Sequence, residues 1–513
     1  MSENSYSCQA LKRGAWHYLT GKAASAAITF VVLLWLVRLL PLEQYGVYVA
    51  LIAASELAYA IGGLGLPWLA ARYLPEYRLK ASGIALVRVC RQILILQAVA
   101  FSTLAGILFV LGGHYLAWLD LQVYRSAAAI FLLVLVFEGL GRFVREPLMG
   151  PLMRQGDARI SLIARQLLIL VFLVLFNSFG LVDVFGVATI EAGASIVSFG
   201  LGWWLLEREF KALKDEKAHP DWEEPTLRAH WGVACRMYLA HLLTLTYSAQ
   251  VLTNVVMRVL GTEATALFGF LRALNDQVAR YLPATLLFSL IRPKLVASYV
   301  GGGGMVELRR NANLAGKLSL FALAALIAFV ALSGDALVGV LSGGKFADTG
   351  WLFLGFMAGL IPFSQRQLLE SVAVTIGRAS VCVWASASGL VMLPLVWVLI
   401  QADFGLWAPV IAIGVGHLAF NSYVLFVIAR RDGYRADWFG VMKILGSAAL
   451  AYLIGAGLPF EWLSNMPSKL SVLLVQAILI VSTYLFLGWI FKPFSNEERE
   501  RINGLFKKQV FIW

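Results

Sequence analysis

Charged residues are scarce in this sequence, and hydrophobic residues are abundant. Only 14% of the 513 residues are Asp, Glu, Lys or Arg, whereas 60% are hydrophobic. Soluble domains carry about 25% charged and about 45–50% apolar residues. One or two soluble cores could not bury so much apolar side chain. The composition therefore excludes an ordinary soluble protein and predicts an all-α polytopic membrane protein.

Cysteine is also rare, and catalytic signatures are missing. The four cysteines form no CxxC pair and have no metal-ligand spacing, so we expect free thiols and no metal site. The strings GxxxxGK[ST], HExxH and GxSxG do not occur. The longest polar stretch, 207–230, is too short for a nucleotide-sugar domain. We therefore expect no enzyme activity and no cofactor.

Apolar runs of about 20 residues, the length of a membrane-spanning helix, recur along the whole chain. The first run lacks a signal-peptide cleavage context and leads straight into the second, so we expect it to be retained. The runs predict 14 spanning helices, near residues 16–40, 45–67, 86–112, 122–145, 158–180, 184–206, 231–258, 264–291, 314–334, 349–376, 379–401, 405–429, 438–458 and 469–492.

The positions of Lys and Arg predict the orientation of these helices. The connections after odd-numbered helices contain few basic residues, mainly Arg38, Arg258 and Lys345, whereas those after even-numbered helices contain many. Because basic loops stay in the cytoplasm, both termini are expected there, in a cell inner membrane. The formal charge of +12 then reflects topology, and we expect no nucleic acid partner.

The second half of the sequence repeats the first at an offset of 220 residues. Arg38 and Glu43 match Arg258 and Glu263, and Glu56 matches Asp276. The match predicts two six-helix lobes arranged as parallel repeats, as in some secondary transporters that work by alternating access. The predicted divisions are an N-lobe at 1–206, a cytoplasmic linker at 207–230, a C-lobe at 231–430, and two further helices with a cytoplasmic tail at 431–513.

Ionisable residues inside the predicted helices are candidate functional groups, because a charge in the bilayer is costly and usually faces a cavity or a partner. Arg272, Asp276 and Arg280 follow one another at four-residue spacing and so share a helix face, with Asn275 nearby. This face predicts a net cationic site. The alternative is an Arg–Asp–Arg ladder that only holds helices together.

Other intramembrane charges extend this candidate cavity. Lys22, Arg142 and Arg366 are predicted substrate-binding residues, while Asp276, Glu56, Glu138 and Glu370 are predicted counter-ions or coupling-ion carboxylates. Each has a structural alternative: Lys22 can extend to the interface, and the pairs at four-residue spacing can be simple salt bridges. Glu191 has no partner in the sequence pattern, and His241 and His417 fit buried core histidines better than ligands.

The predicted cavity is dominated by arginine, which pairs well with phosphate and carboxylate groups. A suitable cargo is therefore anionic and amphipathic, such as a sugar linked to lipid through pyrophosphate. A multidrug-type antiporter for cations predicts an acidic cavity instead. A membrane-embedded polysaccharide polymerase or glycosyltransferase predicts large periplasmic loops, whereas the loops here are short.

Several motifs resemble one family of transporters. The run VRLLPLEQYGVY at 37–48, the glycine-rich turn at 62–67, RYLP at 72–75 and GDAR at 156–159 resemble Wzx-type flippases of lipid-linked oligosaccharides. These belong to the multidrug/oligosaccharidyl-lipid/polysaccharide exporter superfamily. The second repeat departs from the pattern, with Gly261 and Ala266 where the first has Pro41 and Gly46.

The resemblance implies a two-lobed fold with a cationic cavity and ion-coupled antiport. Its implied cargo is a polyprenyl-pyrophosphate-linked glycan, which is flipped from the cytoplasmic to the periplasmic leaflet. Implied partners are membrane lipids, a polysaccharide polymerase and a chain-length protein. The 14 predicted helices also fit lipid II flippases, in which the last two form a lipid groove.

Overall fold

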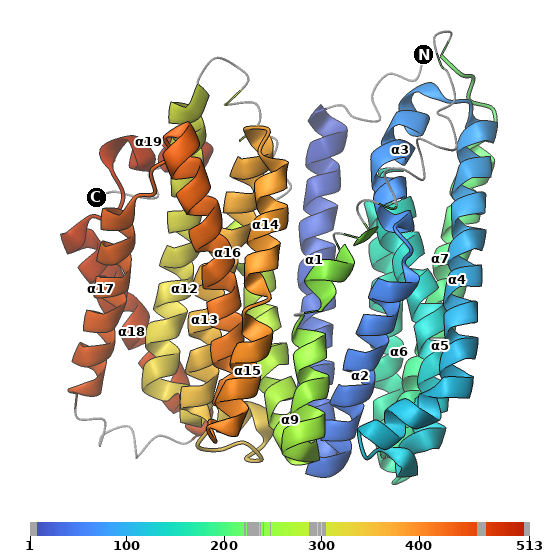
Figure 1. Ribbon diagram of the computed structural model, residues 1–513, viewed down its shortest axis with the longest axis horizontal. Coiled ribbons are helices and arrows are strands. Elements are labelled where there is room, and N and C mark those ends of the chain that lie inside the picture. The colour runs from blue at the N-terminus through green and yellow to red at the C-terminus, as the bar shows by residue number, and fades with distance from the viewer. Residues whose placement is uncertain are drawn as a thin grey trace. The chain divides into compact units, whose positions relative to one another are not determined.

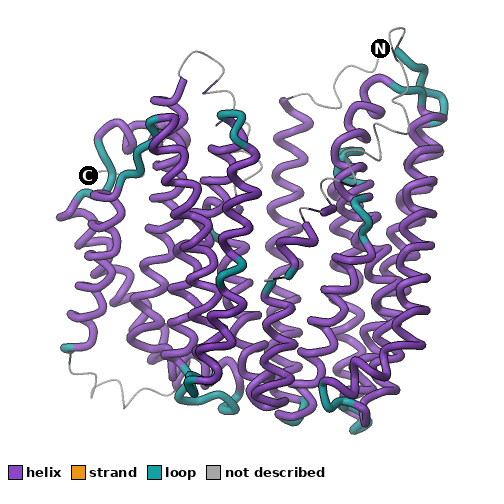
Figure 2. The backbone as a smooth tube through the Cα atoms, in the orientation of Figure 1, coloured by secondary structure: helices purple, strands orange, loops and turns teal. Residues whose placement is uncertain are grey.

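The computed structural model describes residues 8–219, 222, 235, 238–239, 241–246, 248–286, 295, 299, 304–458 and 468–506. The side chains of 8–22, 284, 286, 379 and 504–506 lie outside that description. Within the described residues every regular element is a helix (Figure 2). The prediction of an all-α fold is therefore confirmed.

The described helices include 11 that are long and apolar enough to cross a membrane. One of these stretches, His241–Tyr281, covers parts of two predicted helices. Gly261, at φ 84° and ψ −174°, breaks the helical backbone between them. The left-handed φ of Gly261 is readily available only to glycine. The chain is a multi-pass membrane protein, and the exact count of 14 helices stays a prediction.

The chain divides into two compact units, Met1–Gly269 and Phe270–Trp513. The predicted lobe boundaries at 206 and 230 remain predictions. The first unit (Figure 1) contains α1 (Cys8–Leu39), α2 (Leu42–Gly62), α3 (Leu66–Lys80), α4 (Gly83–Trp118), η1 (Gln122–Tyr124), α5 (Arg125–Phe143), the π-helix η2 (Val144–Leu148), α6 (Gln155–Ser178) and α7 (Val184–Leu213). It also contains α9 (Ala249–Tyr281) as far as Gly269.

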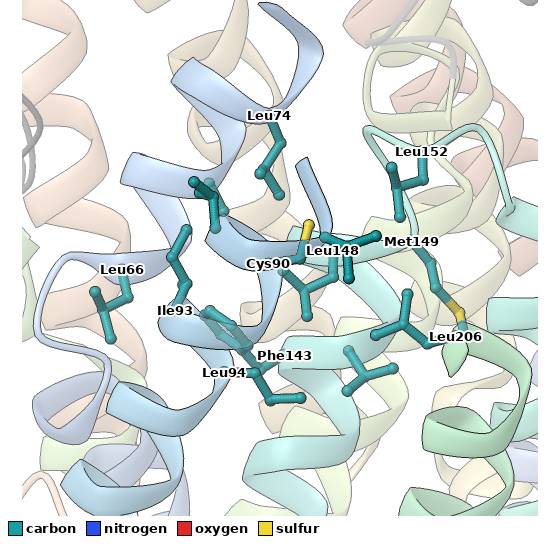
Figure 3. Close-up of a cluster of buried hydrophobic side chains, with 14 of the residues drawn as sticks. Leu66, Leu74, Cys90, Ile93, Leu94, Phe143, Leu148, Met149, Leu152 and Leu206 are labelled. Atoms are coloured by element: carbon teal, nitrogen blue, oxygen red, sulfur yellow. The ribbon is translucent and has the colours of Figure 1, made fainter. Parts of the chain in front are cut away.

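Helix α3 lies where the sequence predicted a plain cytoplasmic connection. A left-handed turn at Leu64 and Gly65 ends the preceding segment, and Pro67 lies in the first turn of α3, where its missing N–H costs nothing. Leu66, Leu74 and other apolar residues of α3 are buried in a cluster with α4, α5, η2 and α7 (Figure 3). Burial of these apolar residues stabilises α3, whereas its basic residues made the segment resemble a loop in the sequence.

The second unit contains the end of α9, α10 (Pro283–Leu286), α12 (Gly304–Ser342), α13 (Gly350–Thr375), α14 (Ala379–Gly389), α15 (Met392–Gln401), α16 (Trp407–Asp432), α17 (Trp438–Ala456), α18 (Lys469–Phe491) and α19 (Asn496–Phe506). Helix α12 packs against α13, α17 and α18 (Figure 1). The predicted helix at 379–401 is two helices, α14 and α15. Helix α19 was not predicted, because its polar sequence indicated only a cytoplasmic tail.

Helix α9 ends earlier than the sequence suggested. Its last residue is Tyr281, and Leu282 separates it from the short α10 that starts at Pro283. Proline disfavours helical conformation in the residue before it and lacks the N–H that continues a helix. The predicted helix over 264–291 is thus interrupted at Leu282, and its residues 287–291 lie outside the described part of the chain. Arg280 lies in the last turn of α9.

Candidate functional site

Three carboxylates and three arginines form a connected ionic network inside the first unit. They come from α2, α5, η2, α6 and α7, so five separate elements contribute to it. The members are Glu56, Glu138, Glu191, Arg142, Arg145 and Arg165. We call this group the ionic network.

Glu138 is the centre of the ionic network. Its Oε1 lies 3.0 Å from Arg142 Nε and 2.7 Å from Arg145 Nη2, and its Oε2 lies 2.9 Å from Arg165 Nε. Only 3% of its side chain is exposed. A buried carboxylate needs such compensation, because losing one partner of a buried pair costs about 3–5 kcal/mol. The predicted pair of Glu138 and Arg142 is present, as one contact among several.

Glu56 and Arg142 form the accessible end of the network. The two guanidinium nitrogens of Arg142 lie 2.8 and 2.9 Å from the two carboxylate oxygens of Glu56, in a bidentate pair. The Arg142 side chain is 42% exposed and that of Glu56 is 27% exposed. Arg142 also lies over the ring of Tyr59, 4.7 Å from its centroid. Among the network's members, these two can meet a solute without unpacking the core.

Glu191 and Arg165 belong to the network, although spacing along the sequence indicated no partner for Glu191. Arg165 pairs with Glu191 through its Nη2, and Tyr48 donates a hydrogen bond of 3.1 Å to the other oxygen of Glu191. Ser195 and Ser198 on α7 accept further hydrogen bonds from Arg165 and Arg145. These residues lie on different helices, so no local spacing could reveal the contacts. The only indication of these contacts in the sequence was the presence of intramembrane charges without a local partner.

The predicted basic face on α9 is only partly assembled. Arg272 Nε lies 3.6 Å from Asp276 Oδ2, and the Arg272 side chain is largely buried. Arg280 is exposed. The side-chain oxygens of Asn275 and Gln277 are buried without a hydrogen-bond partner in the described part of the chain. An unsatisfied buried amide oxygen is uncommon, so this segment keeps unused polar capacity beside an ion pair.

The remaining predicted site residues are dispersed. Arg366 on α13 lies over the ring of Phe420, 4.2 Å from its centroid, and its Nη1 is 3.5 Å from His417 Nδ1. Glu370 is exposed, and within the described residues no ion pair joins it to Arg366. Lys22 lies in α1, but its side chain is outside the described part. In the residues that are described, no group of His, Cys, Asp or Glu could hold a metal ion.

The first part of α9 is held closely against α2 and α4. Tyr115 donates a 2.9 Å hydrogen bond to Asn254, and Arg258 forms an ion pair with Asp120. Gly46 on α2 faces the backbone of Thr262 so closely that an added Cβ would lie 2.0 Å from its carbonyl oxygen. A glycine is therefore required here. Gly46 is part of the run at 37–48 that resembles the flippase family.

An apolar cavity of about 280 Å³ lies between α2, α4 and α5. Its lining is almost entirely hydrophobic and includes Leu57, Leu108 and Phe109. Ser55 also lines it, one residue before Glu56. The first unit thus has an apolar cavity and a charged network on neighbouring positions of α2.

Comparison with known proteins supports a transporter fold. Residues 11–228 match the family described as "Polysaccharide biosynthesis protein". No curated protein matches the sequence. A solved structure titled "Lipid II flippase MurJ, inward closed conformation" matches with a TM-score of 0.70 at 11% identity, over 92% of this chain and 98% of that one.

Transporters of the multidrug resistance MATE family also match. An inward-facing MATE structure gives a TM-score of 0.60 at 14% identity, over 82% of this chain and 98% of that one. An outward-facing one gives 0.56 at 15% identity, over 83% of this chain and 96% of that one. These structures are of transporters and a flippase, not of enzymes. The predicted resemblance to polysaccharide transporters of the multidrug/oligosaccharidyl-lipid/polysaccharide exporter superfamily is thereby confirmed, and this chain has the fold of that superfamily's membrane transporters.

Proposed function

We propose that this protein flips lipid-linked polysaccharide units across the cell inner membrane by ion-coupled alternating access, with both termini in the cytoplasm. The cargo would carry a polyprenyl pyrophosphate, and a polysaccharide polymerase and a chain-length protein would act on the product. The observation that carries the proposal is the half-exposed bidentate pair of Glu56 and Arg142 at the end of an otherwise buried network.

The pair can exchange partners. A guanidinium fork fits a phosphate as well as it fits a carboxylate. If Glu56 takes up a proton, it loses its hold on Arg142, and the same guanidinium becomes available to an anionic group of the cargo. The buried contact to Glu138 keeps Arg142 in place during that exchange. Glu56 is thus proposed as the coupling carboxylate and Arg142 as a cargo-binding residue.

Arg272 and Arg280 remain proposed cargo-binding residues of the second unit, with Asp276 as counter-ion. The orphaned oxygen of Asn275 offers a hydrogen-bond acceptor beside them, which suits the hydroxyl groups of a sugar. Arg366 and Lys22 are proposed to complete the cationic lining. Arg366 is the less suitable of the two for direct binding, because its guanidinium already lies against Phe420 and His417.

The test compares Arg142→Ala with Arg91→Ala in cells that make a surface polysaccharide. Arg91 is a matched control, because it is 43% exposed and pairs with Glu207 away from the network. We expect Arg142→Ala to lower surface polysaccharide at least tenfold and to raise the lipid-linked precursor in the cytoplasmic leaflet. Arg91→Ala should leave both unchanged. Normal export in a folded Arg142→Ala protein would refute the role of Arg142.

The coupling role is tested separately with Glu56→Gln in proteoliposomes. This change keeps the size of the side chain and removes its titration. We expect flipping of a pyrophosphate-linked lipid to persist while its dependence on the ion gradient disappears. If the reconstituted protein instead moves cationic drugs and ignores the lipid, the multidrug-type alternative replaces this proposal.

A further inference from the structure

The second unit contains a polar cavity of about 310 Å³ that is separate from the proposed transport residues. It lies where three helix ends meet: the start of α12, the turn between α16 and α17, and the start of α19. Its lining includes Arg309, Arg310, Arg435 and Arg501. Four arginines around one cavity raise the question of which acids neutralise them.

The acids near the cavity already have basic partners. Lys317, which is 2% exposed, forms ion pairs with Asp437 and with Glu498 at 2.6 Å for the latter. Arg501 donates two hydrogen bonds, of 3.0 and 3.1 Å, to Glu307. Among the described residues, the carboxylates that face this region are therefore committed to Lys317, Arg310 or Arg501.

Arg310 completes that set of pairs. It lies 3.2 Å from Glu307 and 3.3 Å from Glu497. Arg309 and Arg435 line the same cavity, and within the described residues neither forms an ion pair. The cavity therefore has two guanidinium groups outside these ion pairs, and the five basic side chains exceed the four carboxylates by one.

The cavity wall is held in shape by hydrogen bonds that do not involve these two side chains. Asn313 on α12 donates a 3.1 Å hydrogen bond to the backbone oxygen of Arg435 and accepts one of 3.1 Å from buried Tyr434. Burial raises the pKa of the Tyr434 hydroxyl, so it stays a hydrogen-bond donor. The turn that carries Arg435 is thus fixed against α12, beside Arg309.

The residues beside the cavity are those expected at a membrane surface. Trp438 and Phe439, in the first turn of α17, are 63% and 73% exposed. Tryptophan is enriched where lipid headgroups meet the hydrocarbon, and Phe439 presents a second exposed apolar ring beside Trp438. Lys443, one turn further along, lies 4.5 Å from the centroid of the Phe439 ring.

We infer that this cavity binds a phosphate group at the membrane surface through Arg309 and Arg435. The phosphate comes either from the headgroup of an anionic lipid or from free phosphate. Guanidinium groups pair with phosphate through short, charge-assisted hydrogen bonds. Basic pockets at the ends of membrane helices are the sites where lipid headgroups are held. This site is independent of the proposed transport function.

The test uses the full-length protein purified in detergent. Native mass spectrometry measures retention of phosphatidylglycerol against phosphatidylcholine with the same acyl chains, and thermal stability is measured with inorganic phosphate against chloride. The variant is the double change Arg309→Gln with Arg435→Gln. The control is Arg430→Gln with Arg431→Gln, which removes two exposed arginines from the nearby end of α16 that do not line the cavity.

We expect the wild-type protein and the control to retain phosphatidylglycerol at least tenfold better than the variant, the ratio expected when a charge-assisted hydrogen bond is lost. A phosphate-dependent rise in stability without lipid selectivity identifies free phosphate as the ligand. If the variant fails to fold, Arg309→Lys with Arg435→Lys keeps the charge and should retain the lipid partly. Equal retention in variant and wild type, or equal loss in the control, overturns the inference.

Discussion

The two units hold buried charge in different ways. In the first unit, Glu138 pairs with Arg142 of its own helix, with Arg145 of the adjoining η2 and with Arg165 of α6. In the second, Lys317 is almost fully buried in the first half of α12, and its partners come from the α17 N-cap and from α19. Charge inside the first unit is thus paired between spanning helices. In the second unit the pairing depends on α19 and on the start of α17.

The difference shows what each arrangement can do. The ionic network balances three arginines against three carboxylates, so its only freedom is at the exposed pair of Glu56 and Arg142. The Lys317 contacts instead hold α19 beside a cavity in which two arginines form no ion pair with any residue that the structure describes. The first arrangement suits a group that exchanges partners during transport. The second suits a fixed surface site.

The largest expected effect comes from breaking the centre of the ionic network. Glu138→Gln leaves three arginines around a neutral amide, two of them buried. Removing one partner of a buried pair costs about 3–5 kcal/mol, so we expect a severe loss of folded protein. The measurement is thermal stability by size-exclusion chromatography. Glu207→Gln, which breaks an exposed pair with Arg91, is the control and should change little.

If Glu138→Gln proves as stable as the control, the ionic network does not carry the fold of the first unit. The proposed difference between the two units would then be wrong for the first unit. Lys317→Met gives the corresponding measurement in the second unit. Its effect should be smaller, because Asp437 is about one-third exposed and can be hydrated when its partner is lost.

An intermediate effect is expected at the close approach of α2 to α9. Gly46→Ala places a Cβ against the backbone oxygen of Thr262, which cannot move aside as a side chain would. Overpacking of this kind costs about 1–3 kcal/mol. We expect reduced flipping and a stability loss in that range, measured on purified protein. Gly106→Ala on α4, which meets nothing within 4 Å, should be neutral.

The smallest expected effect is a pH dependence in the second unit. Burial alone raises the pKa of Asp437, but the hydrogen bonds from Lys317 and from the Gly440 N–H lower it, and the lowering prevails. Because the folded pKa lies below the unfolded one, its stabilisation is present above about pH 4 and lost as the pH falls through the folded value. We expect a change of about 1 kcal/mol or less.

The measurement is thermal stability between pH 6 and pH 3, compared in wild type and Asp437→Asn. Asparagine can still accept the capping hydrogen bond from Gly440, so the helix cap is kept while the titration and the charge that pairs with Lys317 are removed. A stability loss at low pH that is identical in both proteins would exclude Asp437 as its source.

Much of the fold could be predicted because a membrane simplifies the pattern. Apolar runs such as 184–206 and 469–492 correspond to α7 and α18, since backbone groups in lipid must pair within a helix. Helices α3 and α19 were missed. Their charged faces lie outside the apolar pattern, and the packing of α3 against Cys90 and Phe210 or the contact of Glu498 with Lys317 involves distant residues.

The candidate site was predicted only where its contacts are local. Glu138 with Arg142 and Arg272 with Asp276 lie four residues apart on one helix, so spacing alone indicated them. Glu56 with Arg142, and Glu191 with Arg165, join different helices. The sequence marked these residues as charges that require partners, without indicating which partners.

The sequence by itself determined that this protein lies in a membrane, that it is helical, and that charges inside it need partners. These follow from composition and local spacing, because lipid excludes unpaired backbone and charge from every helix alike. The tertiary structure alone decided which charges pair. It left Glu56 and Arg142 at an exposed end, and Arg309 and Arg435 beside an open cavity. The physical reason is that packing brings distant helices within the few ångströms over which hydrogen bonds act.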